Sequence, residues 1–129
     1  MGVTARVLPR EWAASQSKPR GPIDRVHLAR YTLGNLELEI EILGLFAMQA
    51  PETLRQLKTA LTEKAWRDAA HTLKGSARAV GATRVGDFAE RAEVLKGPEC
   101  TQLRPAAIEA LAAELDDAIA YIERLSQAG

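Results

Sequence analysis

Residues 36–61 have the sequence LELEIEILGLFAMQAPETLRQLKTAL, and this stretch decides the fold class. Its apolar side chains recur at alternating spacings of four and three, which places them on one face of a helix. These positions are Leu36, Ile40, Leu43, Ala47, Ala50, Leu54, Leu57 and Leu61. Such a seam is typical of a bundle helix, and Pro51 within it predicts a kink rather than a break.

Amphipathic stripes on both sides of this stretch predict further helices. The expected helices cover residues 25–33, 36–61, 62–80, 83–96 and 105–126. Asp24 and Thr83 are the expected N-caps, and Gly81 suits the left-handed position after the third long stripe. No segment alternates with period two, and the connections are short, which favours antiparallel neighbours. We therefore expect an all-α, antiparallel up-down four-helix bundle with a short additional N-terminal helix.

The expected bundle covers residues 23–129, and residues 1–22 are expected to be a tail. Its core should bury seven large side chains: Leu54, Leu57, Leu73, Phe88, Leu111, Leu115 and Ile119. With 129 residues and a formal net charge of zero, the chain is the size of one domain and lacks the basic excess of nucleic-acid binders. It has one cysteine and no run of about 18 apolar residues. We expect a cytoplasmic monomer that binds neither nucleic acid nor membrane.

The third stripe carries one of the two histidines on its polar side. At about 100° per residue, His71 lies about 150° from the centre of the apolar stripe and should face solvent. Neighbouring positions on the same face hold Arg67, Lys74, Gly75 and Arg78, with Lys64 one turn further. A mid-helix glycine costs about 1 kcal/mol relative to alanine, so Gly75 suggests that something approaches the backbone there. This combination indicates an exposed nucleophile beside cations that suit an incoming anion.

Residues 70–82, AHTLKGSARAVGA, resemble the signature of histidine-containing phosphotransfer (HPt) domains, a His-x-Leu-Lys-Gly-Ser block followed by Gly-Ala. The resemblance extends over about residues 23–126. It implies that His71 accepts the phosphoryl group, that Lys74 assists the phosphate, and that Gly75 clears space for the partner. Arg67, Arg78 and Lys64 would then contribute charge toward the phosphate and the partner.

This resemblance implies a phosphoryl carrier without catalytic activity of its own. His71 would take the phosphoryl group from an aspartyl phosphate of a receiver domain and pass it to another receiver. Response-regulator receivers and a hybrid sensor histidine kinase are the implied partners, and the receiver would bring Mg²⁺. The chain itself shows no metal-ligand spacing and no glycine-rich nucleotide loop, so we expect no cofactor. HPt domains also present an apolar patch beside the histidine, and we expect Leu45 or Met48 to stay exposed there and to contact the receiver.

Two alternatives stay open. The first is a phosphotransfer domain of the chemotaxis-kinase type, phosphorylated directly by a kinase; the end of the sequence at Gly129 favours a free-standing carrier over this one. The second is an interaction bundle without phosphate chemistry, against which the set His71, Lys74 and Gly75 argues.

Overall fold

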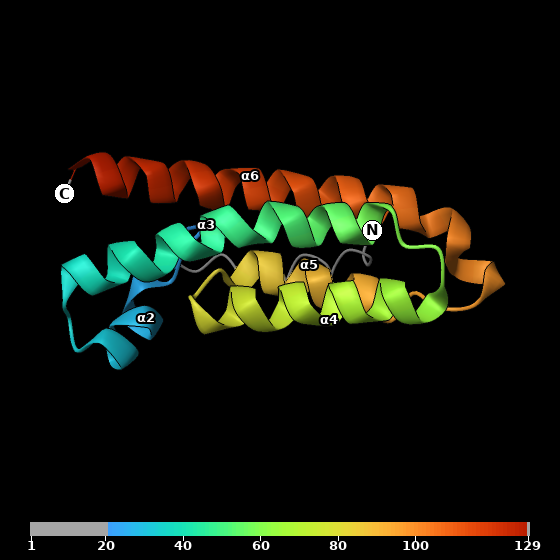
Figure 1. Cartoon of the computed structure of the whole chain (residues 1–129), viewed down its shortest axis with the longest axis horizontal. Helices are drawn as coiled ribbons and strands as arrows, with labels where there is room; N and C mark the ends of the chain where they lie inside the picture. Colours follow the sequence, from blue (N-terminus) through green and yellow to red (C-terminus); the bar gives the residue numbers. More distant parts are fainter. Residues whose placement is uncertain (1–20, 129) are drawn as a thin grey trace, which may run out of the picture.

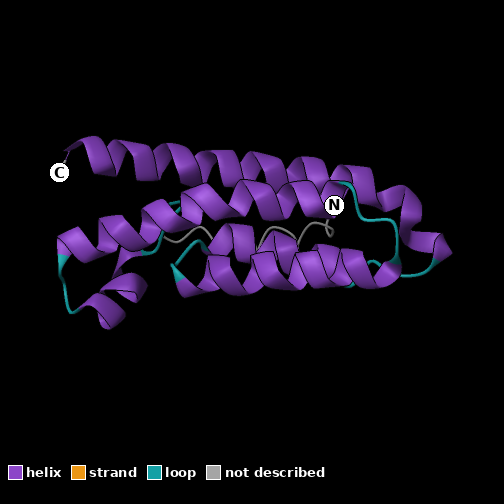
Figure 2. Ribbon diagram, in the orientation of Figure 1, coloured by secondary structure: helices purple, strands orange, loops and turns teal. Residues whose placement is uncertain are grey.

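A computed structural model describes residues 21–128, and all regular structure within them is helical (Figures 1 and 2). The elements are α2 (Arg25–Thr32), α3 (Leu36–Lys58), α4 (Glu63–Ala79), α5 (Thr83–Glu93), a 3₁₀ helix (Pro98–Leu103) and α6 (Arg104–Ala128). The all-α class is therefore confirmed. The tail predicted over residues 1–22 lies almost wholly outside the described residues.

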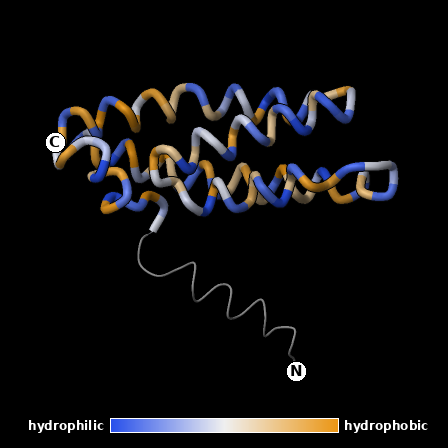
Figure 3. The backbone as a smooth tube through the Cα atoms, turned by 90° about the horizontal axis from the view of Figure 1, so that it is seen from below, coloured by the Kyte–Doolittle hydropathy of each residue, from blue (hydrophilic) through white to orange (hydrophobic). Residues whose placement is uncertain are grey.

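The longer helices lie alongside one another, and α2 sits at one end (Figure 1). Helix α3 packs against α4 and α6, while α5 packs against the same two helices from the other side. Each of these four helices therefore touches two others, and the core lies between them. The up-down order remains the arrangement that the short connections predict. Apolar and polar segments alternate along the helices (Figure 3), as expected for amphipathic helices around one core.

Side-chain caps fix the start of three helices. The carboxylate of Asp24 accepts from the backbone N–H of His27 at 3.1 Å, so its predicted cap is confirmed. The hydroxyl of Thr62 caps α4 by accepting from the N–H of Ala65 at 3.0 Å, and Asn35 caps α3 in the same way. The predicted cap at Thr83 is wrong. Thr83 is the first residue of α5, and its hydroxyl instead donates back to the carbonyl of Gly81 at 3.4 Å.

The turn between α4 and α5 requires a glycine. Gly81 has a φ of +85°, as the sequence predicts, and a Cβ there would lie 2.6 Å from the carbonyl oxygen of Asp24. The N–H of Asp24 donates to the Gly81 carbonyl at 2.7 Å. This contact joins the start of α2 to the end of α4, so any larger residue would force the two apart.

The core contains five of the seven predicted residues: Leu54, Leu57, Leu73, Leu111 and Leu115. Phe88 and Ile119 are only partly buried and pack at the edge of the core, so the prediction is wrong for both. The ring of Phe88 is covered on one face by the guanidinium of Arg91, 4.7 Å from its centroid.

The predicted seam of α3 is too long at both ends. Leu61 is 95 % exposed and Leu36 is also exposed. The reason at the C-terminal end is that α3 stops at Lys58, so Leu61 lies in the turn to α4. The helix runs through Pro51 without a break, as predicted.

None of the helices within residues 21–128 combines the length and apolar character needed to cross a membrane.

Candidate functional site

His71 lies near the middle of α4, on the side away from the core. Its side chain is 68 % exposed, whereas Leu73 and Ala77 on the opposite side of the helix are fully buried. The predicted accessibility of His71 is therefore confirmed. Because the apolar stripe of α4 fixes which side faces the core, it also fixes the direction in which the imidazole projects.

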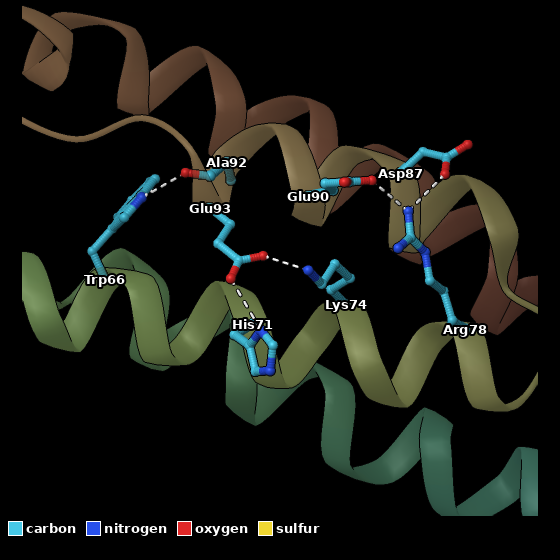
Figure 4. Close-up of polar contacts among 8 residues, drawn as sticks. All are labelled: Trp66, His71, Lys74, Arg78, Asp87, Glu90, Ala92 and Glu93. Atoms are coloured by element: carbon cyan, nitrogen blue, oxygen red, sulfur yellow. Dashed lines mark hydrogen bonds and ion pairs between the residues drawn. The ribbon is translucent and has the colours of Figure 1, made fainter.

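Glu93, near the end of α5, is the partner of His71 that the sequence analysis missed. Its Oε2 lies 3.0 Å from Nδ1 of His71, and its Oε1 lies 2.7 Å from Nζ of Lys74 (Figure 4). The carboxylate is only 19 % exposed. The bond from Lys74 lowers the pKa of Glu93, burial opposes this, and the bond to His71 adds to the lowering. Glu93 is therefore ionised at neutral pH.

The ionised carboxylate determines which ring nitrogen of His71 carries the proton. A carboxylate can only accept hydrogen bonds, so the contact with Glu93 requires a hydrogen on Nδ1. In the neutral imidazole the lone pair then resides on Nε2. The ring projects its other nitrogen away from Glu93 (Figure 4). In its neutral form, His71 thus has a single tautomer and presents the lone pair of Nε2 on the side away from Glu93.

Most of the cations predicted around His71 are already paired. Lys74 bonds Glu93, and Lys64 bonds Asp68 at 2.6 Å. Among residues 21–128, no carboxylate forms an ion pair with the exposed Arg67. Lys74 thus shares the partner Glu93 with His71, and Arg67 forms no ion pair with the residues that the structure describes.

Arg78 is turned toward α5 by two carboxylates (Figure 4). Its guanidinium lies 2.6 Å from Glu90 and 3.2 Å from Asp87. The bond to Glu90 raises the pKa of Arg78, with burial opposing and Asp87 adding to the rise. Gly86 makes room for this crossing, because a Cβ there would lie 2.8 Å from Cγ of Arg78. Arg78 therefore ties α4 to α5 and carries little free charge toward a phosphoryl group.

At Gly75, unlike Gly86, no neighbouring side chain among residues 21–128 requires a glycine. A Cβ built there meets no described atom within 4 Å, and the residue is exposed in mid-helix. Gly86, by contrast, is required by a neighbouring side chain. Because a mid-helix glycine is unfavourable and nothing described in the protein fills the space, the open surface one turn from His71 suits the approach of another molecule.

A hollow of about 310 Å³ lies between α3 and α4 beside this face. It is lined by Gln56, Ala65, Asp68, Ala69 and Thr72. Asp68 and Thr72 flank His71 in the sequence, so the hollow borders the site.

The two predicted docking residues are both exposed, Leu45 by 49 % and Met48 by 66 %. Leu45 is 11 residues from Gln56, about three helical turns, so it shares the flank of α3 that faces α4. Met48 is turned from Gln56 by about 80° around the helix. Leu45 is therefore the better placed of the two toward the His71 side.

No group of three or more metal-ligating side chains suited to an ion occurs among residues 21–128.

In the comparisons with known proteins, a family model described as Hpt domain matches residues 41–127. Neither a curated protein nor a solved structure matches the chain. The matched region begins within α3 and ends within α6, so it contains the whole of α4, α5 and the site between them.

Proposed function

Because the chain belongs to the Hpt domain family, whose members act in histidine–aspartate phosphotransfer, we propose that it carries a phosphoryl group on Nε2 of His71. The observation that supports this most strongly is the contact between Nδ1 of His71 and the ionised carboxylate of Glu93. In the neutral ring this contact places the proton on Nδ1 and the lone pair on Nε2, which projects away from Glu93, and this is the form that acts as a nucleophile.

The transfer step follows from this arrangement. The Nε2 lone pair attacks the phosphorus of an aspartyl phosphate on a receiver domain, and the bond from phosphorus to the aspartate oxygen breaks. The aspartate carboxylate leaves with the bonding electrons. The ring becomes positively charged. Its Nδ1–H stays hydrogen-bonded to Glu93, and the negative charge of Glu93 stabilises the charged ring. Onward transfer to a second receiver is the same step in reverse.

Lys74 has a second role in this proposal. Its ammonium has three N–H donors, and Glu93 uses one of them. The others can reach a phosphoryl oxygen on the neighbouring imidazole. Phosphoryl transfer depends mainly on positioning and charge stabilisation, so a lysine held in place by Glu93 suits the task. The Mg²⁺ that accompanies such transfers is expected on the receiver.

The proposed partners are receiver domains and a hybrid sensor histidine kinase. We propose that the chain binds them as a cytoplasmic monomer. The receiver would cover the His71 face of α4, where Gly75 leaves space, together with the bordering hollow and Leu45 on α3. Leu45 is about half exposed, and a single exposed leucine is the kind of apolar anchor that transient signalling contacts use.

The direct test is to incubate the purified chain with phosphorylated receivers from its own genome and to follow the label. We expect rapid, acid-labile labelling from at least one receiver and none from ATP alone. Labelling only by a kinase with ATP would identify a chemotaxis-kinase type of domain instead. If neither a receiver nor a kinase labels the chain, the alternative of an interaction bundle without phosphate chemistry is favoured.

A further inference from the structure

Two side chains from outside α5 hold its C-terminal end. The last carbonyls of a helix have no partner within it. Here the carbonyl of Ala92 accepts the backbone N–H of Leu95 at 3.1 Å and, from outside the helix, the indole N–H of Trp66 at 2.7 Å. The guanidinium of Arg104 donates to the carbonyl of Leu95, two residues beyond the end of α5, at 2.9 Å. Ala92 directly precedes Glu93, so the backbone of Glu93 is fixed from the side that faces α4 (Figure 4).

Trp66 and Arg104 act as one unit. The guanidinium carbon of Arg104 lies 4.4 Å from the centroid of the Trp66 ring. Arg104 also forms an ion pair at 2.8 Å with Glu63, the first residue of α4. Arg104, at the start of α6, therefore covers the buried indole and joins the beginning of α4 to the end of α5.

We propose that Trp66 and Arg104 are positioning residues for phosphotransfer, because they set where Glu93 stands against His71 and Lys74. Trp66 and His71 belong to the same helix, which holds them about 7.5 Å apart along its axis. The hydrogen bond from Trp66 holds α5 at one point along α4. The bonds of Glu93 to His71 and Lys74 hold α5 at a second point along α4. Hydrogen bonds weaken steeply with distance and angle, so a small slide of α5 would separate Glu93 from His71. This inference rests on the proposed role of His71.

The competing view is that Trp66 only fills the core. Trp66→Phe distinguishes a positioning role from a packing role, because it keeps most of the ring and removes the N–H. The measurement is the ¹⁵N shift of both ring nitrogens of His71 in the unphosphorylated protein, at a pH where the ring is neutral. We expect the fraction protonated on Nδ1 to fall. We also expect about a three- to tenfold slower transfer from a phosphorylated receiver, the range of one hydrogen bond.

Ile122→Val in α6 is the matched control. Ile122 is buried in the core, and its apolar side chain makes no hydrogen bond to the end of α5. It should lower the Tm while leaving the tautomer and the transfer rate unchanged. Arg104→Lys is a second variant in case Trp66→Phe does not fold. It keeps the charge but loses the planar group that stacks on the indole, and it should shift the tautomer in the same direction.

The proposal is wrong if Trp66→Phe and Arg104→Lys behave like Ile122→Val, with a lower Tm and an unchanged His71 tautomer. Because the tautomer is measured without a phosphoryl donor, it tests the positioning role independently. A wild-type chain that never accepts phosphate would instead contradict the proposed function.

Discussion

Nδ1 of His71 lies 3.0 Å from Oε2 of Glu93, although 22 positions separate the two residues in the chain. The same carboxylate bonds Lys74 through its other oxygen. One side chain of α5 thus sets both the tautomer of the imidazole and the place of the ammonium. The account of the site depends on this double contact.

Replacing Glu93 by glutamine should remove the control of the tautomer. An amide can accept from Nδ1–H through its oxygen or donate to Nδ1 through its nitrogen, so it no longer selects one form. We expect a mixture of His71 tautomers by ¹⁵N NMR and about ten- to hundredfold slower phosphotransfer, since hydrogen bonds to charged groups contribute about 1.5–3 kcal/mol. Glu90→Gln is the matched control. It removes the same charge one turn earlier, but Glu90 bonds Arg78 rather than His71. Equal effects of both variants would mean that only the summed charge matters.

Lys74→Ala should slow transfer about tenfold or shorten the lifetime of phosphohistidine, because a charge-assisted donor is lost. Arg67→Ala should act differently. Arg67 is exposed and has no ion-pair partner among the described residues, so its loss should weaken receiver binding chiefly at low salt. Transfer kinetics at several ionic strengths separate the two effects. If both variants lose activity equally and independently of salt, the two roles are assigned wrongly.

Gly75→Gln should make the protein more stable and less active. Glutamine favours a helix over glycine by about 0.5–1 kcal/mol, and no described atom lies within 4 Å of a Cβ at this position. The Tm should rise while transfer slows, because the new side chain occupies the approach to His71. Gly44→Gln in α3 provides the control, since Gly44 is also exposed, helical and unobstructed. It should raise the Tm without slowing transfer. Full activity in Gly75→Gln would remove the steric argument.

The helices and the orientation of His71 follow from local periodicity. The stripe of α4 places Leu73 inside and His71 outside without reference to any other helix, and both placements are found. The same reasoning fails where a helix must end. Leu61 continues the seam of α3, but the chain has already turned away at Lys58.

Glu93 could not be predicted in this way. Its position against His71 depends on the register of α5 on α4, which is set by the turn at Gly81 and by the bond from Trp66 to Ala92. Spacing within one helix carries no information about a carboxylate on the next. For the same reason the sequence analysis assigned the charge of Arg78 to the phosphate and the partner, although two carboxylates of α5 bind it.

Leu45→Asp should weaken receiver binding about tenfold without unfolding the bundle. Its side chain is about half exposed, on the flank of α3 that faces α4, and truncating one apolar anchor costs about 1–2 kcal/mol. Met48→Asp is the comparison, because Met48 is more exposed but points further from α4. Isothermal titration with a receiver measures both. A larger loss in Met48→Asp would place the docking surface on the other flank of α3.

Phosphorylation of His71 itself is the central claim, and His71→Gln tests it most directly. The imidazole is exposed, so the variant should keep its circular dichroism spectrum and Tm. His27→Gln is the control, because His27 lies in α2, where its ring packs edge-on to Tyr31 at 5.3 Å. The measurement is ³¹P NMR after incubation with a phosphorylated receiver. We predict a phosphohistidine signal in the wild type and in His27→Gln and none in His71→Gln, whereas a signal that survives in His71→Gln would contradict the account.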